Sequence, residues 1–296
     1  MTRSSAAFTL LPSGPLLAGC VAGRPAAGRA HILRWSPALR ERILDAPPEA
    51  GRIHSIFERA LNILWHDGGL VALHDPGPLA APFAASVTRL PEGGSLTPGA
   101  EVVRHDSRIL LGTFVLGSEG SRLVDTTIHS TTERPDRLTS LLASTAIPVV
   151  APGLCAPGGR SAQRRLADAI VQRDPRTLVE GARALIGLGE GLTPAGDDCL
   201  VGALAILHRF TRGWLDEHPE IRFPIAAAAR AGTTVVGRDF ILHALDGVFS
   251  EVVLRVVTAP SDHEVRRAAA ALSEMGSTSG ADTMRGMRIA LEALCL

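Results

Sequence analysis

Two adjacent aspartates, Asp197 and Asp198, carry the clearest chemical signal in the chain. They follow a stretch of residues typical of loops and helix starts: Gly187, Gly189, Gly191, Thr193, Pro194 and Gly196. Alternating glycines allow positive φ angles and a close approach of the backbone to a ligand. Threonine as N-cap, followed by proline, predicts a helix near 196–211 with both carboxylates in its first turn. The candidate ligand contacts on the approach to this helix are Gly189, Gly191, Thr193 and Gly196.

A second segment echoes this pattern further along the chain. The positions that recur, each 84 residues later, are Gly196 as Gly280, Asp198 as Asp282 and Gly202 as Gly286. The second copy also precedes a helical pattern, and Ser279 and Asp282 have the spacing of a capping box. Its candidate ligand contacts are Ser277, Thr278, Ser279 and Asp282, with capping alone as the alternative. The echo suggests two similar helix N-termini that face one pocket.

The acidic residues allow more than one chemistry. Helix N-termini favour phosphate and carboxylate groups, but Asp197 and Asp198 would repel an anion placed beside them. One solution is a Mg²⁺ ion held by Asp197, Asp198 and Asp282 between protein and anion. The other is that these carboxylates, as the catalytic candidates, accept hydrogen bonds from an amide NH₂ while the anion lies elsewhere. The structural alternative is capping together with a hydrogen bond to the glycine loop; no cofactor is required.

The composition excludes several reaction classes. The 296 residues carry no net charge, 46% of them are hydrophobic, and neither lysine nor tyrosine occurs. Without lysine there is no Walker-type phosphate site and no Schiff base, and a neutral chain gives no sign of a nucleic-acid surface. Cationic help for an anionic substrate would come from arginine, and Arg238, close to Thr233 and Thr234, is the best candidate. Its alternative role is a surface ion pair.

The periodicity predicts an α+β fold. Short apolar runs broken by turns indicate a mostly antiparallel β-region, with a hairpin turn at His66–Gly69 that favours strands on both sides, over 51–65 and 70–74. Segments 8–11 and 31–35 are predicted as strands or extended segments, and the further predicted strands are 87–90, 101–105, 108–111, 113–116 and 122–125. A short helix is predicted over 37–46. Later segments follow the helical period, and the predicted helices are 137–144, 162–172, 176–187, 196–211, 221–230, 238–248, 251–257, 262–275 and 280–294. We place a β-rich domain at 1–150 and a helical domain that carries both motifs at 151–296.

Targeting signals favour a cytoplasmic protein. Leu17–Cys20 has the form of a lipoprotein cleavage box, but the preceding prolines and glycine make a poor signal helix. No apolar run reaches the length of a membrane span. The four cysteines are far apart, which predicts neither a disulfide framework nor a zinc cluster.

The segment 187–198 resembles the hallmark of a bacterial domain-of-unknown-function family that includes the AllH-type subunit of oxamate carbamoyltransferase. Three further segments fit this family: 54–62 with His54, Ser55 and Asn62, then 233–251, then 276–286. The sequence departs from the family pattern at Glu190, Ala195 and Gly237, where proline, serine and often serine are expected. The resemblance adds His54, Ser55 and Asn62 to the candidate substrate contacts.

The resemblance implies transfer of a carbamoyl group between carbamoyl phosphate and oxamate, in allantoin catabolism. It also implies that the chain works with other subunits of a carbamoyltransferase complex on a small anionic substrate. The alternative is a non-catalytic subunit that binds a small ligand or serves assembly. A third hypothesis, a hydrolase of small amides, lacks a recognisable pair of nucleophile and base.

Overall fold

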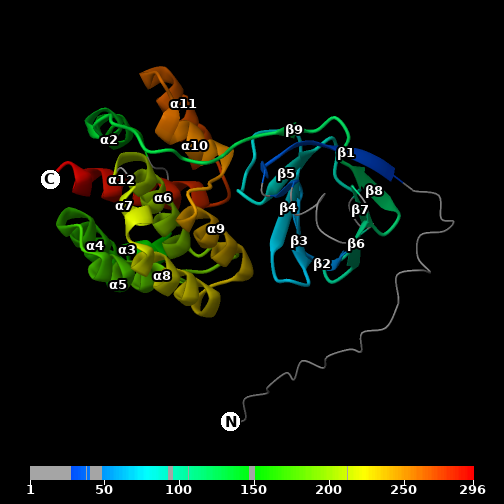
Figure 1. Cartoon of the computed structure of the whole chain (residues 1–296), viewed down its shortest axis with the longest axis horizontal. Coiled ribbons are helices and arrows are strands. Elements are labelled where there is room, and N and C mark those ends of the chain that lie inside the picture. The colour runs from blue at the N-terminus through cyan, green and yellow to red at the C-terminus, as the bar shows by residue number, and fades with distance from the viewer. Residues whose placement is uncertain are drawn as a thin grey trace, which may run out of the picture.

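The computed structural model describes residues 28–37, 39–40, 49–92, 96–105, 107–146, 151–211 and 213–296. A β-region built from the first part of the chain lies beside a helical region built from the second part (Figure 1). The predicted α+β class, with mostly antiparallel strands before the helices, is confirmed, and the β-region is more specifically a barrel. The last strand ends at Leu123 and α2 begins at Asp136, so the change from strand to helix falls between these residues.

In the described residues, eight strands form the closed barrel. They are β1 (Gly28–Trp35), β2 (Glu49–Ile56), β3 (Ala60–Trp65), β4 (Leu70–His74), β5 (Ala84–Val87), β6 (Glu101–His105), β7 (Arg108–Leu111) and β8 (Phe114–Gly117). They follow the order β5-β4-β3-β2-β6-β7-β8-β1, and an antiparallel pairing of β1 with β5 closes the ring. Two pairings of the ring, β4–β5 and β1–β8, are parallel. The short β9 (Arg122–Leu123) pairs in parallel with β1.

The predicted hairpin turn forms as expected. Gly68 has a φ of +84°, and the N–H of Gly69 donates to Asp67 Oδ1 at 2.9 Å. The predicted strand over 51–65 is instead two antiparallel strands, β2 and β3, because the chain reverses where the N–H of Phe57 donates to the carbonyl of Ala60. The strand predicted over 87–90 lies earlier, as β5.

The side chains of the hairpin β3–β4 pack on one face into the barrel core and on the other face against the helical region. All five residues of β4 are buried, although a strand at a barrel surface normally alternates between buried and exposed side chains. Val71 and Leu73 belong to the barrel core. Leu70 and Ala72 instead pack in a second cluster with Val236 of the helical region. The outer face of this hairpin therefore forms the barrel side of the contact with the helices.

The helices agree closely with the predicted ranges. They are α2 (Asp136–Ala143), α3 (Pro152–Cys155), α4 (Pro157–Gln172), α5 (Pro175–Leu185), α6 (Ala195–Phe210), α7 (Trp214–Glu217), α8 (Pro219–Gly232), α9 (Val235–Leu245), α10 (Glu251–Thr258), α11 (Asp262–Ser273) and α12 (Ser279–Leu294). Every residue of α6 from Ala195 to Leu207 is buried, as its apolar sequence predicts. Helices α6 and α12 lie at the centre of the helical region, and α9 and α10 lie nearest the barrel (Figure 1).

The two glycine-bearing helices pack against each other at unusually close range. A Cβ atom on Gly286 of α12 would lie 2.7 Å from the carbonyl carbon of Cys199 on α6. A Cβ atom on Gly202 of α6 would lie 2.9 Å from the carbonyl carbon of Thr283 on α12. Cys199 and Thr283 are themselves 84 residues apart, so the contact is reciprocal. The sequence echo is thus a pseudo-twofold packing of two similar helices.

One buried carboxylate joins the barrel to the helices. Glu251, the first residue of α10, accepts hydrogen bonds from Arg34 of β1 at 2.8 Å and from Arg255 at 2.6 Å. Its other carboxylate oxygen accepts the N–H of Leu79 at 3.0 Å. The loop after β4, the first strand and a helix therefore meet at one side chain.

Several predicted features lie outside the described residues. These are the Leu17–Cys20 box, the first predicted strand at 8–11 and most of a short helix predicted over 37–46.

Candidate functional site

A cavity of about 540 Å³ lies between the barrel and the helices. Its volume is typical of a pocket for a small molecule. Exposed residues in its lining, Phe57, Glu190 and Leu192, mark the side on which it meets solvent. The described side chains that line it include no arginine. Residues of both sequence motifs line the cavity. In the absence of a lining arginine among the described residues, helix N-termini and acidic side chains set the electrostatic potential of the cavity.

Four helices begin at this cavity. Thr193 lines it just before α6, Val236 lines it in the first turn of α9, and Ser250 and Thr278 are the N-cap residues of α10 and α12. The positive ends of helix dipoles favour a negative group nearby. The arrangement therefore favours a negative group at this end of the helices, although the described lining has no side-chain cation.

The barrel contributes four side chains to the cavity, from two directly paired positions of strands β3 and β4. Ala60 pairs with His74, and Asn62 pairs with Ala72, across the β3–β4 ladder. All four line the cavity, because they alternate with residues that point into the barrel core. The two alanines leave room beside the amide of Asn62 and the imidazole of His74.

Asn62 is held in place by the other two predicted residues of its segment. Its Nδ2 donates to Ser55 Oγ at 2.9 Å, and the ring of His54 lies 3.2 Å from the same oxygen. His54 and Ser55 do not line the cavity. Of this segment, the structure therefore brings only Asn62 to the site.

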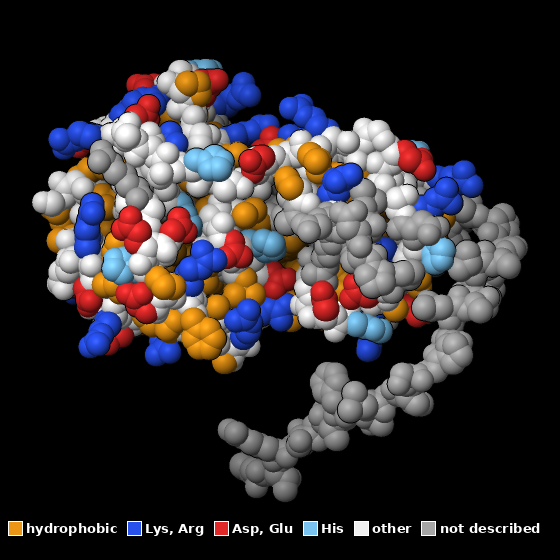
Figure 2. Space-filling view, in the orientation of Figure 1, with side chains coloured by type: hydrophobic (Ala, Val, Ile, Leu, Met, Phe, Trp, Pro, Cys, Tyr) orange, Lys and Arg blue, Asp and Glu red, His pale blue; other side chains and the backbone are white. Residues whose placement is uncertain are grey.

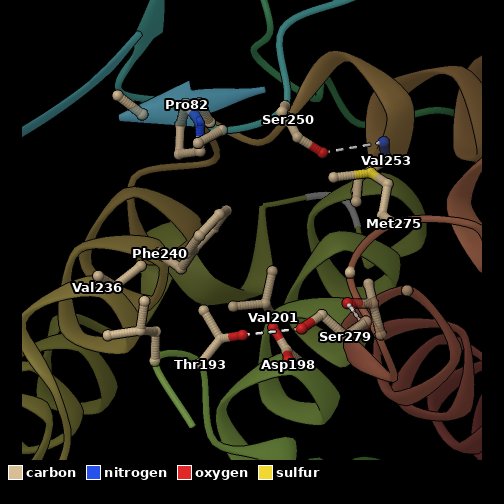
Figure 3. A pocket seen from close by; sticks show the side chains of 18 of the residues that line it. Pro82, Thr193, Asp198, Val201, Val236, Phe240, Ser250, Val253, Met275 and Ser279 are labelled. Atoms are coloured by element: carbon tan, nitrogen blue, oxygen red, sulfur yellow. Dashed lines mark hydrogen bonds between the residues drawn. The ribbon is translucent and has the colours of Figure 1, made fainter. Parts of the chain in front are cut away.

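Asp198 is the buried carboxyl group of the cavity wall. It lies together with Thr193, Ser279 and Val201 on the helical side of the pocket, across from Pro82 of the barrel region (Figure 3). The hydroxyls of Thr193 and Ser279 join the two motifs through a hydrogen bond of 2.8 Å. Asp198 is 7% exposed, and its Oδ2 atom has no hydrogen-bond partner among the described residues.

The surroundings of Asp198 favour its neutral form. Burial raises its pKa well above the usual range, and the charges of Asp282 and Asp197 raise it further. Hydrogen bonds from Ser279 and Thr193 oppose this rise without cancelling it. A protonated Asp198 does not repel an anion, so the conflict between acidic residues and an anionic ligand is reduced.

His74 is a second buried titratable group of the wall, and it is 9% exposed. Burial lowers the pKa of His74, and a backbone hydrogen bond from its ring to Asp75 only partly offsets this. The ring is therefore neutral near pH 7. Its Nε2 atom, like Asp198 Oδ2, has no partner among the described residues.

Asp197 and Asp282 point away from the cavity and support the backbone. Asp197 accepts the N–H of Gly187 at 2.7 Å and the hydroxyl of Thr233. Asp282 accepts the N–H of Ala151 at 3.0 Å. Burial raises the pKa of both groups. Within the described residues, no three His, Cys, Asp or Glu side chains form a group that could hold a metal ion.

The glycine loop is fixed to the start of α9. Thr233 binds Asp197, and Thr234 both caps α9 at Gly237 and donates to the carbonyl of Leu192. The glycines at 187, 189 and 191 have positive φ values of 73°, 117° and 96°, as predicted. Only one of them, Gly191, lines the cavity.

Nine of the sixteen predicted site residues do not line the cavity: His54, Ser55, Gly189, Gly196, Asp197, Thr233, Thr234, Arg238 and Asp282. Gly189 and Gly196 pack tightly against neighbouring backbone, at Ala195 and Leu185 respectively. Arg238, predicted to clamp an anion, forms an ion pair with Asp239 at 2.7 Å and donates to the carbonyl of Gly68. It therefore connects α9 to the β3–β4 turn.

Two predicted capping interactions are wrong. Pro194 is the N-cap of α6, and the Thr193 hydroxyl bonds to Ser279 instead of capping the helix. Thr278 is the N-cap of α12, and no side chain caps that helix, so Ser279 and Asp282 do not form the capping box. Ser277, Thr278 and Ser279 nevertheless all line the cavity. Cys199 is fully buried in the core, and burial raises its pKa to about 12.

The sequence interpretation missed His74 and Ser250. His74 ends an otherwise apolar strand, and its pairing with Ala60 on the outer face of the hairpin brings it to the cavity. Ser250 precedes a helix as a typical N-cap, which gave no reason to expect a cavity there. Among the three departures from the family pattern, only Glu190 lines the cavity.

The molecular surface shows no charge segregation on the face in Figure 2, where arginine and acidic side chains are interspersed.

In the described part of the chain, no helix combines the length and the apolar character that a membrane crossing requires.

Comparison with known proteins identifies both halves of the chain. A family model described as AllH family N-terminal domain matches residues 31–123, which include the barrel strands. A second model, described as oxamate carbamoyltransferase subunit AllH, matches residues 185–291, which include both glycine–aspartate motifs. Neither the curated proteins nor the solved structures gave a match. The two matches cover most of the chain, which therefore belongs to the AllH family of oxamate carbamoyltransferase subunits.

Proposed function

We propose that this chain is the subunit of a carbamoyltransferase that binds the small carboxylate substrate, with oxamate as acceptor and carbamoyl phosphate as donor. One observation carries the proposal: the first turns of four helices, including those of both motifs, meet at one cavity. The size of the cavity suits small metabolites. The family description supports this class of enzyme.

The reaction needs positioning and charge stabilisation more than a covalent intermediate. The amide nitrogen of oxamate attacks the carbamoyl carbon, the bond from that carbon to the phosphate oxygen breaks, and the nitrogen proton passes to the released phosphate. Holding both reactants in one orientation supplies much of the acceleration in such a transfer. The helix N-termini supply a favourable field for the oxamate carboxylate.

The described lining offers no arginine to balance a phosphate dianion. We therefore propose that other subunits of the complex supply the cation for carbamoyl phosphate, and that the active site is completed by assembly. Any Mg²⁺ that accompanied the phosphate would need ligands besides Asp198. We also propose that the reaction takes place in the cytoplasm, where the free thiols of the described residues, Cys155, Cys199 and Cys295, would remain reduced.

The test is carbamoyl transfer by the assembled complex. The chain, purified with its partner subunits, is supplied with carbamoyl phosphate and oxamate, and phosphate release is followed. Asp198→Leu keeps the number and branching of the side-chain heavy atoms but has no polar atoms, and we expect it to lower kcat/KM about 100-fold. Asp168→Asn, on the exposed face of α4, is the matched control and should retain full activity.

Thermal unfolding of both variants separates loss of activity from loss of the fold. A folded Asp198→Leu complex with wild-type activity would overturn the catalytic role of the cavity. It would then favour the alternative, in which the chain is a non-catalytic binding or assembly subunit.

A further inference from the structure

Two unpartnered polar atoms belong to residues on opposite walls of the cavity. Asp198 Oδ2 comes from α6, and His74 Nε2 comes from β4. Both side chains are more than nine-tenths buried, and both residues line the cavity. Buried polar atoms are almost always hydrogen-bonded in folded proteins. Of the buried side-chain atoms without a partner among the described residues, only these two belong to residues that line the cavity, where a ligand can supply the partner.

The hydrogen-bonding role of His74 follows from its other nitrogen. Nδ1 lies 2.7 Å from the carbonyl oxygen of Asp75. A carbonyl can only accept, so Nδ1 carries the proton. In the neutral ring Nε2 is then a bare acceptor. Nε2 can accept a hydrogen bond from an N–H or O–H donor, but it cannot donate one to a carboxylate or phosphate oxygen.

Asp198 offers a different combination. A neutral carboxyl group has one O–H donor and one C=O acceptor side by side. An amide group presents the complementary pair, a C=O acceptor next to an N–H donor. An ionised carboxylate ligand has only acceptors, so it can pair with the O–H donor of Asp198 but not with its C=O acceptor. The hydroxyls of Thr193 and Ser279, bonded to each other, hold this corner of the wall in place.

We propose that Asp198 and His74 recognise the N–H groups of a small ligand that carries a primary amide or ureido group. The ligand's carboxylate then lies toward the helix N-termini of the same cavity. This inference deepens the proposed function and rests on it for the identity of the ligands. Oxamate and the carbamoylated product both carry such N–H groups, whereas oxalate has the same carbon skeleton without them. Asp198 and His74 are thus assigned as specificity-determining residues.

The experiment compares oxamate with oxalate by isothermal titration calorimetry on the full chain. We expect oxamate to bind at least about tenfold more tightly, although oxalate carries the larger negative charge. His74→Phe keeps an aromatic ring but removes Nε2, and Asp198→Leu removes both carboxyl oxygens. Each variant should bring the ratio of the two dissociation constants close to one.

The chain offers a matched control for the histidine. His208 is a partly buried histidine whose pKa is also lowered by burial, but its Nε2 is bonded to the carbonyl of Ala244 and it does not line the cavity. His208→Phe should keep the wild-type ratio. Asp198→Asn, which retains one donor and one acceptor, should keep part of the preference and so distinguish pairing from loss of the fold.

Each result decides between the two proposals. Equal affinity for oxamate and oxalate, or no binding of either, overturns the amide recognition even if the complex transfers carbamoyl groups. A clear preference for oxamate in a chain whose complex is inactive supports the recognition and overturns the proposed function.

Discussion

The close packing of α6 against α12 predicts that Gly286→Ala lowers the free energy of unfolding. The same substitution at Gly158, which has free space around it, should raise the free energy of unfolding. Gly286→Ala would place a methyl group 2.7 Å from the carbonyl carbon and 3.0 Å from the Cα of Cys199, and nearer still to the Cys199 oxygen. Contacts shorter than 3.0 Å essentially do not occur for a real Cβ atom, so the two helices would have to separate. Both partners are backbone atoms, which cannot rotate out of the way as a long side chain can.

The magnitude follows from two opposing effects. Replacing glycine by alanine inside a helix normally stabilises it by about 0.5–1 kcal/mol. Forcing an extra methyl group into a packed core costs about 1–3 kcal/mol, and more where backbone must move. Because the obstacle at Gly286 is backbone, we expect a net loss of about 2 kcal/mol or more.

The control is Gly158→Ala on α4, where nothing lies within 4 Å of the added methyl group. This variant should raise the free energy of unfolding by up to about 1 kcal/mol. Urea denaturation monitored by circular dichroism measures both variants. If Gly286→Ala were as stable as Gly158→Ala, the close crossing of the two motif helices would be refuted.

Three further predictions concern the junction, the buried acid and the loop. Glu251→Gln weakens the contacts with Arg34 and Arg255. We expect it to lower the free energy of unfolding in urea denaturation by about 2 kcal/mol, and an unchanged midpoint would contradict this. Asp198 has a raised pKa in the folded protein, so the stability it contributes is complete below its unfolded value of about 3.9 and is lost as pH rises through the folded value. Asp198→Asn should therefore be more stable than the wild type at neutral pH and lose less stability between pH 4 and 8, and parallel pH profiles would contradict this. Thr234→Val removes the cap of α9 and its bond to the glycine loop, and a thermal melt should show a loss of about 1 kcal/mol, whereas an unchanged melting temperature would argue against the cap.

Much of the fold could be predicted from periodicity and turn residues. The helices and the β3–β4 hairpin follow from the helical period and from an Asp-Gly turn, which are local signals. Closure of the barrel could not be predicted, because the pairing of β1 with β5 joins distant segments through backbone hydrogen bonds that leave no local pattern.

The site was predictable as a meeting of two motifs but not in its details. The echo between the segments around Asp198 and Asp282 correctly indicated two helix starts at one cavity. It could not show that Asp282 bonds the backbone at Ala151 while Asp198 faces the cavity. His74 was missed because its place depends on strand register and on which face the helices cover, both of which are tertiary properties.

A crystal structure of the chain with bound oxamate tests the central claim most directly. We expect the ligand in the cavity between the barrel and the helices, with its amide group within hydrogen-bond distance of Asp198 or of His74 Nε2 and its carboxylate toward a helix N-terminus. Oxamate bound elsewhere, or bound in the cavity with its carboxylate against Asp198 and its amide free, would contradict the account.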